Sequence, residues 1–160
     1  MTKPMFAWAG GKQKLLKHYL PYFPEQHIKT YSEPFFGGGA MFTYVVERYN
    51  PKVAYLNDIN GEIIGIYRAV RDHLGDFIKL LQVYENQYLP LCPDGRKSYY
   101  YQLRDRNKLD YRSWSEVEQA AAQFVLLKTC YRGLWLNDED LNGRFNTGAG
   151  CIPLRFSPVQ

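Results

Sequence analysis

The chain has 160 residues, of which 46 % are hydrophobic and 22 % charged, and it carries a formal net charge of +4. This composition is that of a globular protein and excludes a disordered or collagen-like chain. No stretch approaches the roughly 20 consecutive apolar residues that a membrane-spanning helix needs, and the first residues lack the apolar core of a secretory signal. We therefore expect a cytoplasmic protein, and the length suits either one compact domain or one piece of a larger one.

The first 60 residues alternate between strand and helix signals. A Gly-Gly turn opens a short amphipathic helix over residues 10–20, which Pro21 ends. Beyond it we predict a strand over Ile28–Glu33, a glycine loop, a helix over Ala40–Tyr49 and a strand over Val53–Leu56. Strand, glycine loop, helix and strand in this order form half of a βαβαβ nucleotide-binding fold.

After Asn60 the pattern becomes helical. Apolar residues keep helical spacing over residues 61–89, and the prolines and glycine of segment 89–95 predict a loop. Helix resumes through the basic segment that follows, and Ser115–Lys128 is the clearest helix, with Ser115 as its N-cap. The polar stretch 131–150 predicts an extended loop or a hairpin.

Neither cysteine nor histidine spacing indicates a metal site. The cysteines (Cys92, Cys130 and Cys151) form no Cys-x-x-Cys pair, and the three histidines are equally scattered. We therefore expect a reduced protein without a bound metal.

The excess positive charge is concentrated in residues 96–114. This segment holds six Lys and Arg against two Asp, together with four tyrosines and Trp114. Basic side chains neutralise phosphates and aromatic rings stack on bases, so the mixture suits a nucleic-acid contact. A solvated basic helix face with tyrosines packed beneath it explains the composition equally well.

The glycine loop is the first candidate ligand site. Three consecutive glycines between a strand and a helix let the backbone approach a ligand, and Asp58 follows at the spacing of an acid that binds a ribose. The loop is not a true G-x-G-x-x-G, since Phe42 takes the place of the third glycine. The alternative is a tight turn of positive φ, with Asp58 capping the next helix.

A second candidate is the segment Ala7–Lys12. Its Gly-Gly turn lies between an indole and an ammonium group, which could both face a bound ligand. Equally, Trp8 could be a core residue and Lys12 the solvated start of a helix.

Several blocks together resemble the Dam-type (D12 class) family of DNA adenine-N6 methyltransferases. The blocks, in family order, are F-A-W-A-G-G-K (6–12), Y-S-E-P-F-F-G-G-G-A-M-F (31–42), Y-L-N-D-I-N (55–60), L-K-T-C-Y-R-G-L-W (127–135) and N-G-R-F-N-T-G-A-G (142–150). The resemblance implies an α/β fold, namely an incomplete Rossmann-like methyltransferase sheet with an inserted, mostly helical target-recognition domain. It also implies transfer of a methyl group from S-adenosylmethionine to N6 of a flipped adenine in duplex DNA.

By the same resemblance, residues 1–60 are the first part of a cofactor-binding domain, and residues 61–150 a recognition domain with a hairpin near 131–146. The residues implied to bind S-adenosylmethionine are Trp8, Lys12, Glu33, Pro34, Phe35, Gly37, Gly39 and Asp58. Those implied to contact DNA are Arg96, Lys97, Arg104, Lys128, Tyr131, Arg132 and Asn146, with Tyr131 and Arg132 at an intercalating tip.

Three positions depart from the family pattern. Arg132 stands where asparagine is usual, and Leu136 where an arginine commonly reads a guanine edge. The F-N-x-P-x-G block is F-N-T-G-A-G, without its proline. Recognition of GATC therefore does not follow from the resemblance.

The family's catalytic D-P-P-Y block is absent. The chain has nine prolines and no two are adjacent, so no catalytic residue is assigned. We expect residues 151–160 to be the stub of a missing catalytic half, and the chain to be truncated or split from a separately encoded half and inactive alone. The alternative is a non-catalytic remnant that binds DNA or cofactor.

Overall fold

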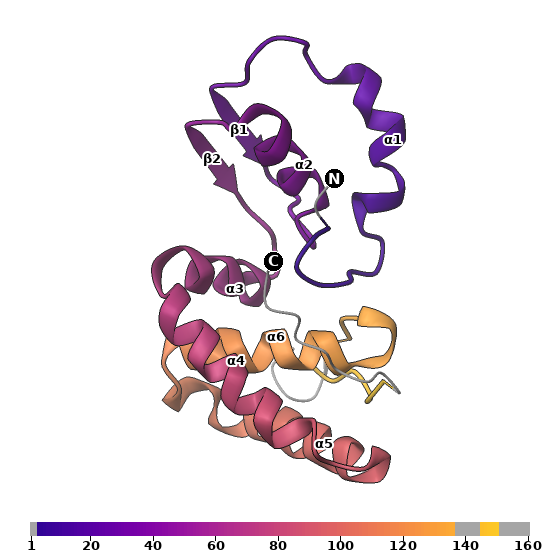
Figure 1. Ribbon diagram of the computed structural model, residues 1–160, viewed down its shortest axis with the longest axis vertical. Helices are drawn as coiled ribbons and strands as arrows, with labels where there is room; N and C mark the ends of the chain where they lie inside the picture. Colours follow the sequence, from indigo (N-terminus) through magenta and orange to yellow (C-terminus); the bar gives the residue numbers. More distant parts are fainter. Residues whose placement is uncertain (1–2, 137–144, 151–160) are drawn as a thin grey trace.

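The computed structural model describes residues 3–136 and 145–150. It is a mixed α/β structure, mostly helical, with one small parallel sheet. Figure 1 shows the sheet with α2 and the N-terminal segment in the upper part, and α3 to α6 below. Residues 137–144 of the predicted hairpin and the predicted stub over residues 151–160 lie outside the described residues.

The sheet consists of β1 (Thr30–Glu33) and β2 (Val53–Leu56), joined through α2 (Ala40–Tyr49). The strands are parallel, with Thr30 opposite Val53 and Glu33 opposite Leu56. Both strands therefore end at the same edge, where the loops after them meet. The predicted strand, glycine loop, helix and strand are confirmed, and the bounds of α2 and β2 agree with the sequence pattern.

The helix predicted over residues 10–20 is broken into pieces. The structure has η1 (Lys12–Lys14), α1 (Leu16–Tyr19) and η2 (Leu20–Tyr22) instead. None of these pieces has a side-chain cap, and Pro21 lies inside η2. Uncapped ends leave backbone N–H groups without partners, and Pro21 cannot donate within the last turn, so both features disfavour one continuous helix.

The helical part comprises α3 (Gly61–Asp72), α4 (Leu74–Tyr88), α5 (Pro93–Asp110) and α6 (Glu116–Thr129), with η3 (Tyr111–Ser113) before α6 and η4 (Tyr131–Gly133) after it. The prediction of a loop over 89–95 was wrong at its end, because α5 already begins at Pro93. Proline fits the first helical position, where its fixed φ suits the helix and its missing N–H costs nothing.

Helix α6 is the centre of the helical part. Ser115 caps it, and the Glu118 carboxylate accepts a hydrogen bond from the Ser115 N–H at 2.8 Å, which completes a capping box. Its residues from Ala120 to Leu127 are all buried. Packing on every side favours small or apolar residues, which the alanines and leucines supply, and the one buried polar side chain of this stretch, Gln123, donates to Glu62 at 3.0 Å.

The upper part joins the same core through two phenylalanines. Phe6 packs edge-on against Phe124 of α6, with ring centroids 6.2 Å apart. Phe36, from the loop after β1, packs edge-on against Tyr67 of α3 at 4.5 Å. The loop after β1 is therefore held against the helical part rather than standing free of it.

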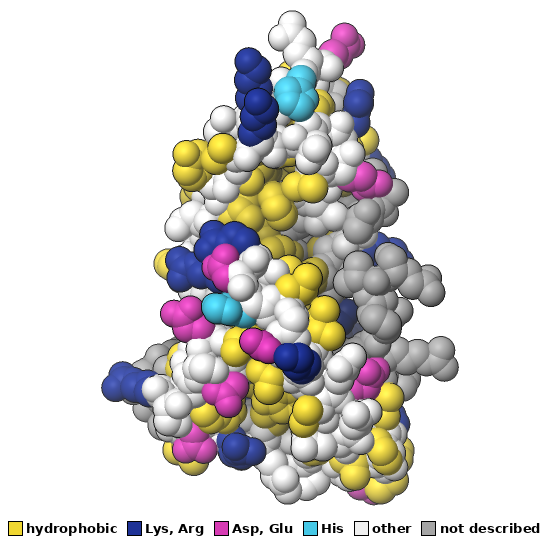
Figure 2. All heavy atoms as spheres, turned by 60° about the vertical axis from the view of Figure 1, so that its left-hand side comes forward, with side chains coloured by type: hydrophobic (Ala, Val, Ile, Leu, Met, Phe, Trp, Pro, Cys, Tyr) yellow, Lys and Arg dark blue, Asp and Glu magenta, His cyan; other side chains and the backbone are white. Residues whose placement is uncertain are grey.

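The strands themselves are poorly covered. Val53 and Tyr55 of β2 are 43 % and 64 % exposed, and Ile59 beyond the strand is fully exposed. Figure 2 shows hydrophobic side chains gathered on the upper half of this face. Parallel strands are normally buried on both faces, so this sheet exposes apolar surface that such sheets usually bury.

Candidate functional site

A cavity of about 220 Å³ lies where the Gly-Gly turn after Trp8 faces the loops that follow the two strands. It is lined by Trp8, Gly10, Gly11, Lys12, Phe35, Phe36, Gly37, Gly38, Ala40 and Asp58. Five of the eight residues predicted to bind a cofactor are among them, although they come from three separate stretches of sequence. Of the other three predicted residues, Pro34 and Gly39 adjoin lining residues in the chain, and Glu33 directly precedes Pro34.

Lys12 is tied to the loop after β1. Its Nζ lies 2.9 Å from Oε1 of Glu33 and also donates to the backbone carbonyls of Phe35 and Phe36. The prediction that Lys12 flanks a ligand site is therefore compatible with the structure, whereas a purely solvated lysine is not. The ammonium group joins the N-terminal turn to the far wall of the cavity.

Glu33 is the buried partner in this contact. The residue is only 6 % exposed, and its second oxygen, Oε2, accepts a hydrogen bond of 2.8 Å from the Tyr31 hydroxyl. Burial raises the pKa of the Tyr31 hydroxyl, and the negative charge of Glu33 raises it further. The hydroxyl therefore stays protonated and acts as a donor. Each Glu33 oxygen thus has a partner, as a buried carboxylate requires.

Asp58 lies at the end of the stretch after β2 and holds two backbone groups. Its Oδ2 accepts from the Gly37 N–H at 2.7 Å, and its Oδ1 accepts from the Asn60 N–H at 3.0 Å. The cap of α3 is Asn60, whose side chain accepts from the N–H groups of Glu62 and Ile63. Asp58 therefore holds the glycine loop from the stretch after β2 and does not cap the helix, contrary to the alternative considered for it.

The glycine loop needs glycine at two positions. Gly37 and Gly39 have φ of +57° and +79°, which other residues rarely adopt. A Cβ at Gly37 would lie 3.3 Å from the indole of Trp8. The loop backbone thus passes close to the ring of Trp8, which is half-buried and forms one wall of the cavity.

Phe35 and Pro34 complete the loop. Phe35 is 80 % exposed although it lines the cavity, so one wall is an uncovered aromatic ring. The Pro34 carbonyl accepts a hydrogen bond of 3.2 Å from the Asn57 amide, which links the two loops at the edge of the sheet. Within the described residues, no three His, Cys, Asp or Glu side chains are grouped to hold a metal ion.

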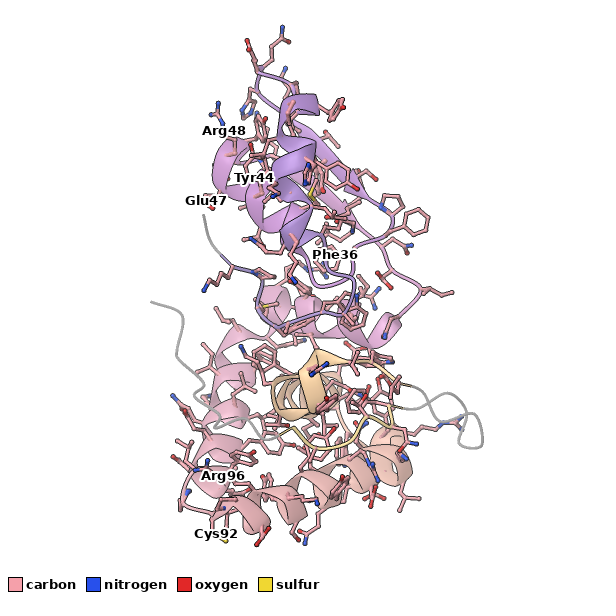
Figure 3. The ribbon with its side chains drawn as sticks, turned by 90° about the vertical axis from the view of Figure 1, so that its right-hand side faces the viewer. Phe36, Tyr44, Glu47, Arg48, Cys92 and Arg96 are labelled. Atoms are coloured by element: carbon pink, nitrogen blue, oxygen red, sulfur yellow. The ribbon has the colours of Figure 1, made fainter. Side chains whose placement is uncertain are left out.

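The residues predicted to contact DNA are divided between two places. Arg96 lies near the start of α5, far from the labelled Phe36 in Figure 3. Its Nη2 donates to the Leu89 carbonyl at 2.6 Å, and its guanidinium lies over the ring of Tyr88. Arg96 therefore fixes the turn between α4 and α5, while the neighbouring Lys97 is exposed.

The other end of α5 meets the base of the predicted hairpin. Lys108 donates to the Asn146 side chain at 2.6 Å, and the buried Tyr100 hydroxyl donates to the Thr147 carbonyl at 2.7 Å. Arg104 lies over the ring of Tyr101. Arg104 thus lies one turn of α5 before Lys108, which holds Asn146, whereas Arg96 lies near the start of the helix.

The stretches on either side of residues 137–144 run antiparallel. Cys130 forms an isolated antiparallel bridge with Ala149, and the Tyr131 N–H donates to the Gly148 carbonyl at 2.9 Å. Arg132 has a φ of +56°, and its guanidinium lies over the ring of Tyr131. Tyr131 and Arg132 are both exposed at this turn, just after the half-buried Lys128 of α6.

Sequence reasoning missed two contacts that matter to the cavity and the hairpin. Tyr67 of α3 donates to the Gly38 carbonyl, and Lys108 holds Asn146. Tyr67 belongs to an apolar helix face, and Lys108 to a run of basic residues. Neither position carries a pattern that distinguishes it from ordinary packing or ordinary surface charge.

Comparisons with known proteins agree on one family. The family model of D12 class N6 adenine-specific DNA methyltransferases matches residues 8–156. The Type II methyltransferase M.MjaIII of Methanocaldococcus jannaschii is 34 % identical over 153 residues, which are 93 % of this chain and 52 % of that protein. M1.LlaDCHI of Lactococcus lactis subsp. cremoris is 35 % identical over 135 residues, or 83 % and 43 % of the two chains.

A phage relative shows the same pattern. The DNA N-6-adenine-methyltransferase of Escherichia phage P1 is 30 % identical over 158 residues, which are 99 % of this chain and 19 % of that protein. The chain thus spans about half the length of the relatives it matches, or less. The matched region includes the whole cavity and the hairpin base, and the chain belongs to the D12 class N6 adenine-specific DNA methyltransferase family.

Proposed function

We propose that the chain is the cofactor-binding and target-recognition part of a site-specific DNA methyltransferase that acts on adenine N6 in duplex DNA. Residues 1–60 belong to an incomplete Rossmann-like cofactor domain, and residues 61–150 to an inserted helical recognition domain. The observation that carries the proposal is the convergence of Trp8, Lys12 and the loops after β1 and β2 on one cavity at the ends of two parallel strands.

S-adenosylmethionine fits the groups that line this cavity. The Asp58 carboxylate has about four acceptor positions and uses two of them on Gly37 and Asn60, so two remain for the hydroxyls of a ribose. The exposed ring of Phe35 offers a face on which an adenine can stack. The glycine loop lets a ligand approach the backbone closely. The cofactor supplies the methyl group on its sulfonium sulfur.

The DNA-facing surface is proposed at the hairpin end of the helical part. Lys108, which donates to Asn146, and Lys128 bring positive charge to this region, while the Arg104 guanidinium is paired with Asp105 at 2.9 Å. Tyr131 and Arg132 are exposed at the turn after α6. Cations there would neutralise phosphates, while an exposed tyrosine beside a flipped base can fill the gap left in the stack. Arg96, whose guanidinium donates to the Leu89 carbonyl in the turn between α4 and α5, contributes positive charge away from the hairpin end.

We further propose that methyl transfer needs a second half. The chain has no adjacent prolines and hence no D-P-P-Y block to accept the N6 hydrogens of adenine. The exposed apolar residues of β2 would be covered by further strands of the sheet. The proposed partner is a separately encoded C-terminal methyltransferase half that supplies these strands and the catalytic block.

Two measurements test the proposal. Labelled S-adenosylmethionine should bind the purified chain in equilibrium dialysis, and Asp58→Ala should weaken this binding. Methyl transfer to duplex DNA should appear only when the chain is co-expressed with the product of a downstream reading frame that encodes the D-P-P-Y block. Transfer by the chain alone would contradict the requirement for a second half. Cofactor binding without transfer by the pair would favour a non-catalytic remnant.

A further inference from the structure

Tyr67 belongs to α3 but reaches the glycine loop. Its hydroxyl donates to the Gly38 carbonyl at 3.1 Å, across 29 positions of sequence. Its ring packs edge-on against Phe36, with centroids 4.5 Å apart and planes at 89°. Figure 3 shows Phe36 where the upper part of the molecule meets the helical part. Tyr67 therefore connects the helical part to the backbone of Gly38, which lines the cavity.

The glycine loop is held from two sides. On one side the Gly37 N–H donates to Asp58, and on the other the Gly38 carbonyl accepts from Tyr67. A Cβ at Gly39 would collide with the Tyr67 hydroxyl and would lie 2.7 Å from the Phe36 ring. Glycines lose more conformational freedom on ordering than other residues, so these contacts decide how often the free protein holds the loop in one shape.

The Tyr67 hydroxyl is a permanent donor under ordinary conditions. Burial raises the pKa of this hydroxyl well above its usual value, and the negative charge of Glu33 adds to the shift. The hydroxyl therefore stays protonated at neutral and mildly alkaline pH. The hydrogen bond to Gly38 does not depend on pH in that range.

We propose that Tyr67 is a positioning residue for the cofactor site. Tyr67 orders residues 37–39 in the free protein, so that their conformational entropy is not lost when the ligand binds. This inference rests on the proposed function, since it takes S-adenosylmethionine as the ligand of the cavity. Pre-ordering raises affinity because the conformational entropy is lost on folding and not on binding. It also makes the cofactor site depend on the helical part, to which α3 belongs.

The test compares Tyr67→Phe with Tyr49→Phe in the full chain. Phenylalanine keeps the ring of Tyr67 and removes only its hydroxyl. Tyr49 is a matched control, because its hydroxyl also donates to a backbone carbonyl, that of Pro24 at 2.8 Å, and it does not line the cavity. Hydrogen exchange over residues 36–40 of the free protein reports the order of the loop, and equilibrium dialysis reports binding of labelled S-adenosylmethionine.

Tyr67→Phe should speed exchange in the loop and weaken cofactor binding, each by about 3- to 10-fold, as the loss of one neutral hydrogen bond implies. Tyr49→Phe should leave both unchanged, even where its melting temperature falls equally. Unchanged exchange and unchanged affinity in Tyr67→Phe would overturn the proposal. If the unmodified chain binds no cofactor, the proposed function fails, whereas the exchange measurement still decides whether Tyr67 orders the loop.

Discussion

The Gly37 N–H donates to Oδ2 of Asp58 at 2.7 Å, across 21 positions of sequence. This bond joins the loop after β1 to the stretch after β2 at the edge where both parallel strands end. One carboxylate thus fixes the glycine loop and still has lone pairs for a ligand. The two roles of Asp58 can be separated by substitution.

Asp58→Asn should weaken cofactor binding by about 10-fold or more, because a hydrogen bond to a charged acceptor contributes about 1.5–3 kcal/mol. The amide oxygen can accept from only one of the two backbone N–H groups, so the melting temperature should fall, but less than in Asp58→Ala. Asp58→Ala should weaken binding at least as much and should also lower stability, since it leaves the Gly37 and Asn60 N–H groups without their acceptor. Equilibrium dialysis and thermal unfolding measure the two effects, and equal unfolding temperatures for both variants would contradict this assignment.

Lys12→Met should destabilise the chain. It leaves the nearly buried Glu33 carboxylate with the Tyr31 hydroxyl and without its cation, which costs about 1–3 kcal/mol when a buried acceptor loses a partner. The double variant K12M/E33Q should recover part of this loss, because the carboxylate charge is then removed as well. Urea unfolding measures the free energies.

The control for this prediction is Lys79→Met. Lys79 pairs with Asp76 at 3.0 Å, but both side chains are well exposed to solvent. Exposed pairs contribute about 0–1 kcal/mol, so this variant should be close to the unmodified chain in stability. A loss at Lys79 as large as that at Lys12 would show that burial of Glu33 is not the cause.

Gly39→Ala and Gly65→Ala should have opposite effects. Gly39 has a φ of +79°, and a Cβ there meets Tyr67 and Phe36, so alanine should cost about 2–4 kcal/mol through strain and overpacking. Gly65 lies inside α3 with nothing within 4 Å of a Cβ, so alanine should stabilise the chain by about 0.5–1 kcal/mol. Thermal unfolding distinguishes them, and tolerance of alanine at Gly39 would mean that the loop does not need its left-handed conformation.

The sequence predicts local order well and distant pairings poorly. The bounds of α2 and β2 follow from apolar spacing and the flanking glycine and proline, and the Ser115 cap of α6 follows from its capping residues. Periodicity does not distinguish a basic side chain that folds back, as Arg96 does onto Tyr88, from one that faces DNA. That distinction depends on how the end of α4 meets the start of α5, which only the fold supplies.

The residues predicted to bind a cofactor divide in the same way. Gly37 and Asp58 could be paired from their spacing, because a strand, helix and strand bring their loops together. The role of Glu33 as the buried partner of Lys12 depends on how the N-terminal turn lies over the loop. Tyr67 gave no signal, since a tyrosine on an apolar helix face is ordinary core.

Lys128→Met should stabilise the chain and weaken its proposed binding to DNA. Burial lowers the pKa of the Lys128 ammonium from its ordinary 10.5, so folding is penalised while this group is charged. That penalty is largest below the lowered pKa and disappears as the pH rises from the lowered pKa to the ordinary 10.5. The gain in melting temperature over the unmodified chain should therefore be largest at neutral pH and shrink towards pH 10.5.

The DNA side of this prediction follows from counterion release. Loss of one phosphate contact should make the plot of log affinity against log salt less steep, by about 1 in slope. Titration of labelled duplex at several salt concentrations measures this slope. Lys79→Met serves again as the control, because Lys79 pairs with Asp76 on α4 and is not among the residues proposed to face DNA. A stabilised Lys128→Met that binds duplex as tightly as the unmodified chain would remove Lys128 from the DNA surface. A destabilised variant would instead show that the ammonium is stabilised by its position over Phe124 and not penalised by burial.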